Sequence, residues 1–127
     1  LRFGDSGGID SAATDYSWGI SSAAAGGGAV EYRTDSNDDA IELFHQDGID
    51  NVGSRQFSGT LFISGGNGTF RPMVRGVTSG EAAGAPYTSD VIGIHLTAIT
   101  MTQIQILFLA GNIISGVFTL YELMEDT

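Results

Sequence analysis

Short apolar runs with alternating spacing, separated by clusters of small and polar residues, are the feature that most limits how this chain of 127 residues can fold. Alternation of apolar and polar residues is typical of a strand that buries one face. The clusters between the runs are rich in glycine, asparagine and aspartate, which accept the backbone dihedrals of tight turns. No run of 18 apolar residues occurs, so we expect no membrane insertion. The sequence therefore predicts an all-β chain.

The runs are numerous enough to predict about eight or nine short strands. A chain of this length buries a single core, so we expect one domain, residues 1–127, folded as an antiparallel β-sandwich of jelly-roll type. Ser64–Gly68 has the composition of a hairpin turn between runs at 56–63 and 69–77. Further strands are expected at 16–20, 30–32 and 41–43, with a helical turn as the alternative for 38–46. Loops are expected at Gly4–Asp15, Ser21–Gly28, Asp35–Asp39 and Ser79–Pro86.

The run 91–99 alternates along its whole length and predicts a strand with one buried face. His95 stands at the opposite parity from the isoleucines, so we expect its ring to face solvent or a partner chain. The face expected to be buried consists of Ile92, Ile94, Leu96 and Ala98.

The closing stretch, 104–122, predicts two strands that fold back on each other around Gly111-Asn112. The last strand has apolar residues on both faces, which predicts burial inside the sandwich or against a neighbouring subunit. This stretch therefore supplies the expected interface of the protein. Its residues are Ile106, Phe108, Val117, Phe118, Leu120 and Tyr121.

The charge balance argues against one class of partner. Five arginines and no lysine stand against fifteen Asp and Glu residues, for a formal charge of −10. Affinity for nucleic acid comes largely from Lys and Arg contacts to phosphate, so no nucleic-acid binding is expected. The chain has no cysteine, which leaves no disulfide framework and no thiolate chemistry.

Gly4-Asp5-Ser6-Gly7-Gly8 matches the pentapeptide around the nucleophilic serine of trypsin-like proteases, and also the G-x-S-x-G pattern of the α/β-hydrolases. In the proteases the His and Asp partners precede that serine, whereas only five residues precede Ser6. In the hydrolases the motif joins a strand to a helix within βαβ units, which this sequence does not predict. We therefore expect a tight turn in which the Asp5 side chain bonds to the backbone two residues on, and no enzyme. A hydrolase using Ser6 is the remote alternative.

A calcium loop is the next candidate, because 35–39 reads D-S-N-D-D, the opening of a helical calcium-binding loop. Ala40 stands where that loop needs glycine, and Gln46 stands where it needs a bidentate Glu. His45 and His95 have no metal-ligand spacing. We expect solvated acidic loops, with no metal and no cofactor. Irregular alternatives would use Asp47, Asp50 and Asn51, or Asp10 and Asp15.

Aromatic side chains present flat apolar faces that could stack on a sugar. Tyr16 and Trp18 occupy alternating strand positions, where core or interface packing is the stronger interpretation. Tyr87 lies in the stretch 85–88, which we expect to be a loop. Tyr87 and the nearby Asp90 are therefore the candidate ligand-facing residues.

Three segments resemble structural proteins of tailed bacteriophages. Residues 1–18 combine Leu-Arg-Phe, a Gly-Gly pair and Asp-Tyr-Ser-Trp in the order found in that family. Phe57–Ile63 resembles the central Ser-Gly strand of those proteins. Residues 106–121 are similar to the terminal pattern I-F-x-x-x-G-N-I-x-S-G-x-F-x-L-Y.

The resemblance implies a β-sandwich module of a phage tail, fibre or particle surface, and it brings no catalytic residues. Members of the family also have strands before the segment equivalent to 1–3, so the chain is expected to lack N-terminal strands of a longer protein. We expect a virion component that forms a homotrimer and contacts other virion proteins. Attachment to a host-surface glycan or receptor is a further expectation, and decoration of the capsid head is the alternative.

Overall fold

The computed structural model describes residues 1–44, 56–82, 84–107 and 116–122. These residues form strands and loops, without helices, in two antiparallel sheets. The expectation of an all-β sandwich with about eight strands is confirmed. The strands are β1 (Arg2–Asp5), β2 (Gly8–Ile9), β3 (Tyr16–Ala24), β4 (Glu31–Asp38), β5 (Phe57–Ser64), β6 (Met73–Ala82), β7 (Ala85–His95) and β8 (Gln103–Gln105).

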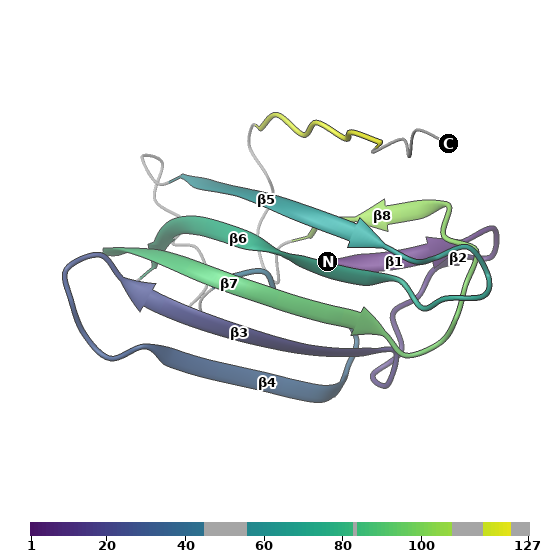
Figure 1. Ribbon diagram of the computed structural model, residues 1–127, viewed down its shortest axis with the longest axis horizontal. Coiled ribbons are helices and arrows are strands. Elements are labelled where there is room, and N and C mark those ends of the chain that lie inside the picture. Colours follow the sequence, from purple (N-terminus) through teal and green to yellow (C-terminus); the bar gives the residue numbers. More distant parts are fainter. Residues whose placement is uncertain (45–55, 83, 108–115, 123–127) are drawn as a thin grey trace, which may run out of the picture.

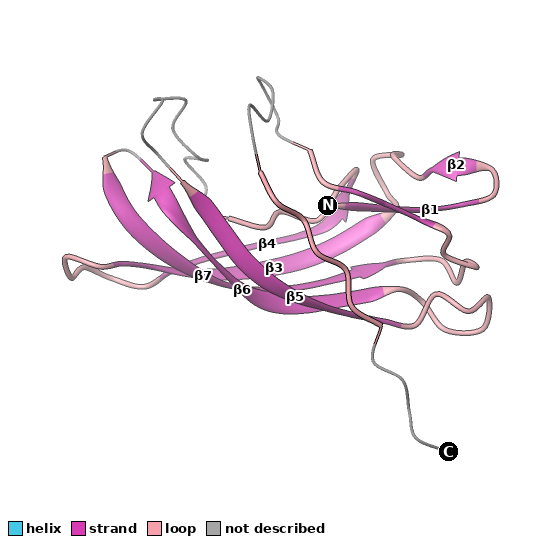
Figure 2. Cartoon of the chain, turned by 90° about the horizontal axis from the view of Figure 1, so that it is seen from above, coloured by secondary structure: helices cyan, strands magenta, loops and turns pink. Residues whose placement is uncertain are grey.

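The small sheet has the order β2-β1-β8 and the large sheet has the order β4-β3-β7-β6-β5. The first and last strands are neighbours, with Phe3 opposite Ile104. Strands β5, β6 and β7 follow one another as a meander inside the large sheet. Figure 1 shows the five long strands side by side, and Figure 2 shows the large sheet curving beneath β1 and β2. β4 and β5 are the two edges of the large sheet.

The core lies between the sheets, where Phe3 of β1 meets Tyr16 of β3 at 6.4 Å between ring centroids. The Tyr16 hydroxyl accepts a hydrogen bond from the Phe3 N–H at 2.8 Å and lies 2.8 Å from the Asp10 carbonyl oxygen. Leu1 and Ile41 bond to each other through both backbone groups. One polar side chain thus joins the sheets across the core. The other buried apolar residues of this cluster are Trp18, Ile20, Val74, Val91 and Ile99.

The predicted buried face of the run 91–99 is wrong, because the face of β7 that points to the core carries Val91, Gly93 and His95. Ile92 is 55% exposed, and His95 is only 2% exposed. A glycine at position 93 leaves room for the side chain of Ile41, which would lie 2.6 Å from a Cβ there. Two of the three inward positions, Gly93 and His95, therefore carry no aliphatic side chain, although they are packed against the core.

Three expected loops are largely strand. Ser21–Ala24 extend β3, Asp35–Asp38 belong to β4, and Ser79–Ala82 extend β6. Backbone pairing holds these segments where apolar alternation is missing, and Ser22 Oγ lies 2.7 Å from Ser89 Oγ inside the sheet. Residues 41–43, expected as a strand, are described without strand pairing. Small polar side chains can line a sheet interior when they bond to each other.

β5 and β6 pair antiparallel, as the predicted hairpin requires, but the connection runs over residues 65–72, so residues 69–72, expected in the second strand, lie in the turn. Gly65, Gly66 and Gly68 have φ values of 78°, 74° and 84°, the left-handed region in which glycine carries no steric cost. The Asn67 side chain accepts the amide hydrogens of Thr69 and Phe70 at 3.0 Å. The turn is closed by the chemistry that its composition predicted.

The closing hairpin is not formed as expected. β8 covers only Gln103–Gln105, and residues 116–122 have no strand assignment. The turn at Gly111-Asn112 and the side chain of Phe108 lie outside the described residues. Burial of the last strand inside the sandwich is wrong, because its large apolar side chains are 64–93% exposed and no described strand pairs with it. Those side chains belong to Val117, Phe118, Leu120 and Tyr121.

Candidate interaction surface

Ser6 lies in the turn between β1 and β2 and is exposed. The Gly7 N–H donates to Asp5 Oδ1 at 2.6 Å, so the predicted side-chain turn is present. The turn joins two antiparallel strands, with Asp5 opposite Gly8. A G-x-S-x-G hydrolase needs a strand-to-helix elbow at this point. The motif is therefore accounted for as a hairpin.

The acidic residues proposed for calcium are bonded to protein groups. Asp38 Oδ2 accepts from Trp18 Nε1 at 2.8 Å, and Asp39 Oδ2 lies 2.7 Å from Arg2 Nη2. Asp15 Oδ2 accepts the Ala12 N–H at 2.7 Å. The alternative at Asp47, Asp50 and Asn51 lies outside the described residues. Within the part of the chain that the structure describes, no three metal-ligating side chains are grouped to hold an ion.

His95 is a buried residue rather than the exposed one that its position predicted. Its Nδ1 lies 2.7 Å from the Thr97 carbonyl oxygen and 3.2 Å from the Thr97 nitrogen, and its ring stands edge-on to Tyr16 with centroids 5.0 Å apart. Asp10 Oδ2 lies 3.1 Å from Nε2, without the alignment of a hydrogen bond. Burial raises the pKa of Tyr16 to about 12. This cluster fixes the position where β1 meets the large sheet.

Tyr87 and Asp90 do not form a ligand-facing loop. Both belong to β7 and stand three positions apart, so their side chains lie on opposite faces of the sheet. Tyr87 pairs with Ala24 and Gly80 and is half-buried on the inner side. Asp90 pairs with Ser21 and Val77 and is exposed. The prediction of a loop at 85–88 was wrong because the hairpin turn is tighter and centred on Gly84.

Apolar side chains gather on the outer face of the large sheet, the face turned away from the small sheet. Residues directly opposite each other on paired strands point to the same side. One row crosses from Tyr32 through Asp90 to Val77, and the next crosses from Ile92 through Arg75 to Phe62. We call this the outer face. Its large apolar side chains, which are 41–76% exposed, are Tyr32, Phe62, Met73, Val77 and Ile92.

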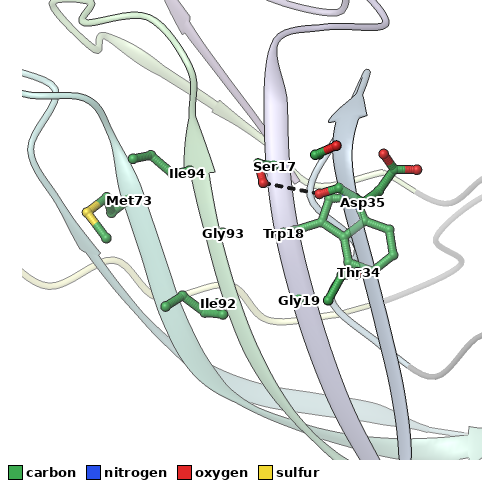
Figure 3. A pocket seen from close by; sticks show the side chains of 10 residues that line it. Ser17, Trp18, Gly19, Thr34, Asp35, Met73, Ile92, Gly93 and Ile94 are labelled. Atoms are coloured by element: carbon green, nitrogen blue, oxygen red, sulfur yellow. Dashed lines mark hydrogen bonds between the residues drawn. The ribbon is translucent and has the colours of Figure 1, made fainter.

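Two shallow hollows run across the outer face. One of about 560 Å³ lies over β4, β3, β7 and β6, and Figure 3 shows Met73, Ile92 and Ile94 at its side. The other, of about 800 Å³, extends to Thr60 and Phe62 of β5. Gly19 belongs to both, and a Cβ there would lie 3.6 Å from Ile92 Cγ2. Because Gly19 has no side chain, the two hollows are continuous across the middle of the outer face.

No family model, curated protein or solved structure matches this chain. Among the described residues, no helix is long and apolar enough to cross a membrane.

The sequence predicted an interface at the chain's end, and the outer face was not predicted. Of those predicted interface residues, Ile106 packs partly buried against the core. The missed signal was Val91-Ile92-Gly93: apolar residues on both parities of one run indicate a strand with two apolar faces. Strand β5 carries the same signal in Leu61, Phe62 and Ile63.

Proposed function

We propose that this chain is a non-enzymatic assembly module that buries its outer face against further copies of itself. The observation that carries the proposal is the exposure of five large apolar side chains on one sheet face. Soluble single chains seldom expose large contiguous apolar patches, and such patches mark protein contacts. With a formal charge of −10, copies repel at long range, so apolar contact has to supply the attraction. The assembly we propose is a homotrimer.

The setting we propose is the particle of a tailed bacteriophage, as a tail or fibre component. Its support is the resemblance of residues 1–18, 57–63 and 106–121 to structural proteins of such particles. Other virion proteins, and a host-surface glycan or receptor, are the further partners in this setting. Antibody labelling of particles from a host culture producing this chain would test it, and label absent from tail and fibre would contradict it.

The assembly is tested by sedimentation velocity of the purified chain at micromolar concentration. We expect an oligomer, and we expect the Ile92→Thr/Val77→Thr variant to dissociate at least tenfold more readily. Both substitutions keep β-branched residues, so the strands should persist. Thr14→Ser, in the exposed loop before β3 and outside the outer face, is the matched control and should behave as the unmodified chain. A monomeric unmodified chain would overturn the proposal.

A further inference from the structure

The two edges of the large sheet differ in how they are protected. β4 carries Glu31, Arg33, Asp35 and Asp38, and its pairing with β3 has a register shift. Charges and irregular pairing are the usual means by which an edge strand avoids another chain. β5 has the sequence FSGTLFIS, with no charge and no proline, and it pairs with β6 over eight consecutive residues without a shift. β5 is an open edge.

The segment 116–122 has the composition of a strand but no strand partner. Its sequence is GVFTLYE, and none of its residues is within a described sheet. Figures 1 and 2 show it extended on the β5 side of the molecule, beyond β5 in one view and in front of it in the other. The apolar exposure of 64–93% is a large cost in water. A partner strand that covers these apolar side chains would therefore stabilise the segment.

We infer that the segment 116–122 of one copy adds to the large sheet of a second copy as a strand beside β5. Main-chain hydrogen bonds to an open sheet edge would supply affinity, and alternate side chains would supply specificity. The inference rests on the proposed function, because it names the second copy as the partner. It adds a second contact, at an edge rather than on the outer face.

The two partners match in polarity on both sides. Next to β5, the outer face offers Phe62, and the inner face offers Leu61 and Ile63, which are partly buried against the core. A strand at 117–121 would place Phe118 and Leu120 on one side, and its other apolar residues on the opposite side. A segment with two apolar faces suits a sheet edge with apolar residues on both faces.

The charges also favour this contact. β5 has no ionisable residue, and the segment has only Glu122 at its end, whereas the whole chain carries −10. Arg75, opposite Phe62 on the neighbouring strand, has no carboxylate partner among the described residues and lies on the outer face. Pairing at this edge therefore brings two nearly neutral segments together within a strongly acidic protein.

The exchange is directional, because a segment meets an edge rather than another segment. Contacts of this heterologous type close into rings when the rotation between copies permits. Three copies, each donating to the next, would complete the proposed trimer. A closed ring leaves no open β5 edge.

The chain has no cysteine, so engineered cysteines give unambiguous cross-links. We would mix a Thr60→Cys variant with a Thr119→Cys variant under mild oxidation; these positions are central in β5 and in the segment. We expect a disulfide-linked dimer. A mixture of Thr34→Cys, on the protected edge β4, with Thr119→Cys is the control and should stay uncross-linked. The Thr60→Cys/Thr119→Cys double variant should give species up to a trimer.

Cross-linking confined to single copies of the double variant would overturn the inference, as would no cross-link between Thr60→Cys and Thr119→Cys. A second measurement uses Thr119→Pro, which removes a backbone donor from an exposed segment, and Thr119→Val as its control. We expect at least tenfold weaker association for the proline variant alone. If Ile92→Thr/Val77→Thr dissociates the oligomer and Thr119→Pro does not, the edge contact is wrong and the proposed function stands. If Thr119→Pro dissociates the oligomer and Ile92→Thr/Val77→Thr does not, the contact through the outer face is wrong and the contact at the β5 edge stands.

Discussion

The two faces of the large sheet differ in an unusual way, because polar side chains are buried on the inner face and large apolar side chains are exposed on the outer face. The inner face includes buried Ser22, Thr78, Ser89 and His95, whereas the outer face carries exposed Ile92 and other large apolar residues. Inner polar groups are tolerated because they bond to each other or to the backbone, as Thr78 Oγ1 does to Leu43 O. Outer apolar groups have no such compensation within one chain. The comparison teaches that the strand register, rather than the polarity of a side chain, decides which residues are buried here, and it is the reason for proposing the outer face as a surface for contact.

The largest expected difference between the faces is in stability. Trp18 on the inner face is 5% exposed, donates to Asp38 and lies beneath the Arg33 guanidinium. Trp18→Ala should lower the free energy of unfolding by about 3–5 kcal/mol, because it leaves a cavity. Tyr32→Ala, on the outer face, should change it by less than about 0.5 kcal/mol. Urea unfolding of the monomer at low concentration measures both, and equal losses would abolish the contrast.

Alkaline pH should distinguish the two faces, because the buried Tyr16 and the exposed Tyr32 should affect stability differently as pH rises. Burial raises the pKa of Tyr16 from 10.0 to about 12, so the neutral form is favoured in the folded state. Its contribution to stability is complete below pH 10 and is lost as pH rises toward 12, by an amount on the order of 2–3 kcal/mol.

Urea unfolding between pH 8 and 11.5 should therefore show a decline in the unmodified chain that is much weaker in Tyr16→Phe. Tyr32→Phe, at an exposed position, should retain the full decline. An unchanged decline in Tyr16→Phe would mean that Tyr16 is not the responsible group.

Gly93 tests how closely the inner face is packed. In Gly93→Ala the new methyl group would overlap the Ile41 side chain, at 2.6 Å from Cγ2, and should cost about 1–3 kcal/mol. Ile41→Ala in the same chain should recover part of that loss, since it removes the Cγ1, Cγ2 and Cδ1 atoms that lie nearest to the new methyl group. A double-mutant cycle measures the coupling. Simple additivity of the two losses would show that Ile41 does not fill the space above Gly93.

The smallest effect concerns the buried hydroxyl pair. Ser22→Ala removes the partner of Ser89, whose side chain has no exposure, and should cost about 1 kcal/mol. Ser22→Ala/Ser89→Ala should be closer to the unmodified chain than the single variant, because no hydroxyl is then left without a partner. Thermal unfolding would detect the difference, and a double variant with the summed loss would contradict the pairing argument.

The sequence allowed the fold class, the strand number and the Ser64–Gly68 hairpin to be predicted, because period-two runs and glycine-rich turns act locally. It misassigned the inner face of β7, since Gly93 owes its place to Ile41, which is remote in the chain. His95 was assigned to the surface for the same reason: its neighbours Tyr16 and Asp10 are brought to it by the fold. Pairing of strands supplies information that no local pattern contains.

The outer face also exceeded what the sequence could predict. Val117 and Phe118 were predicted to lie on opposite faces of a closing strand, but the described residues contain no such strand pair. The outer face was hidden because its members come from four strands, with Phe62 and Tyr32 far apart in the chain. Which residues share the outer face depends on the register of the strand pairs, so the face can be predicted only when that register is known.

The Tyr16 hydroxyl has a consequence for hydrogen exchange. The Phe3 amide hydrogen is held by a side chain of the opposite sheet instead of by a neighbouring strand. Its exchange with deuterium therefore reports separation of the two sheets, while the amides paired across β6 and β7 report melting of the large sheet itself. A sandwich that opens before it unravels would reveal itself at this one amide.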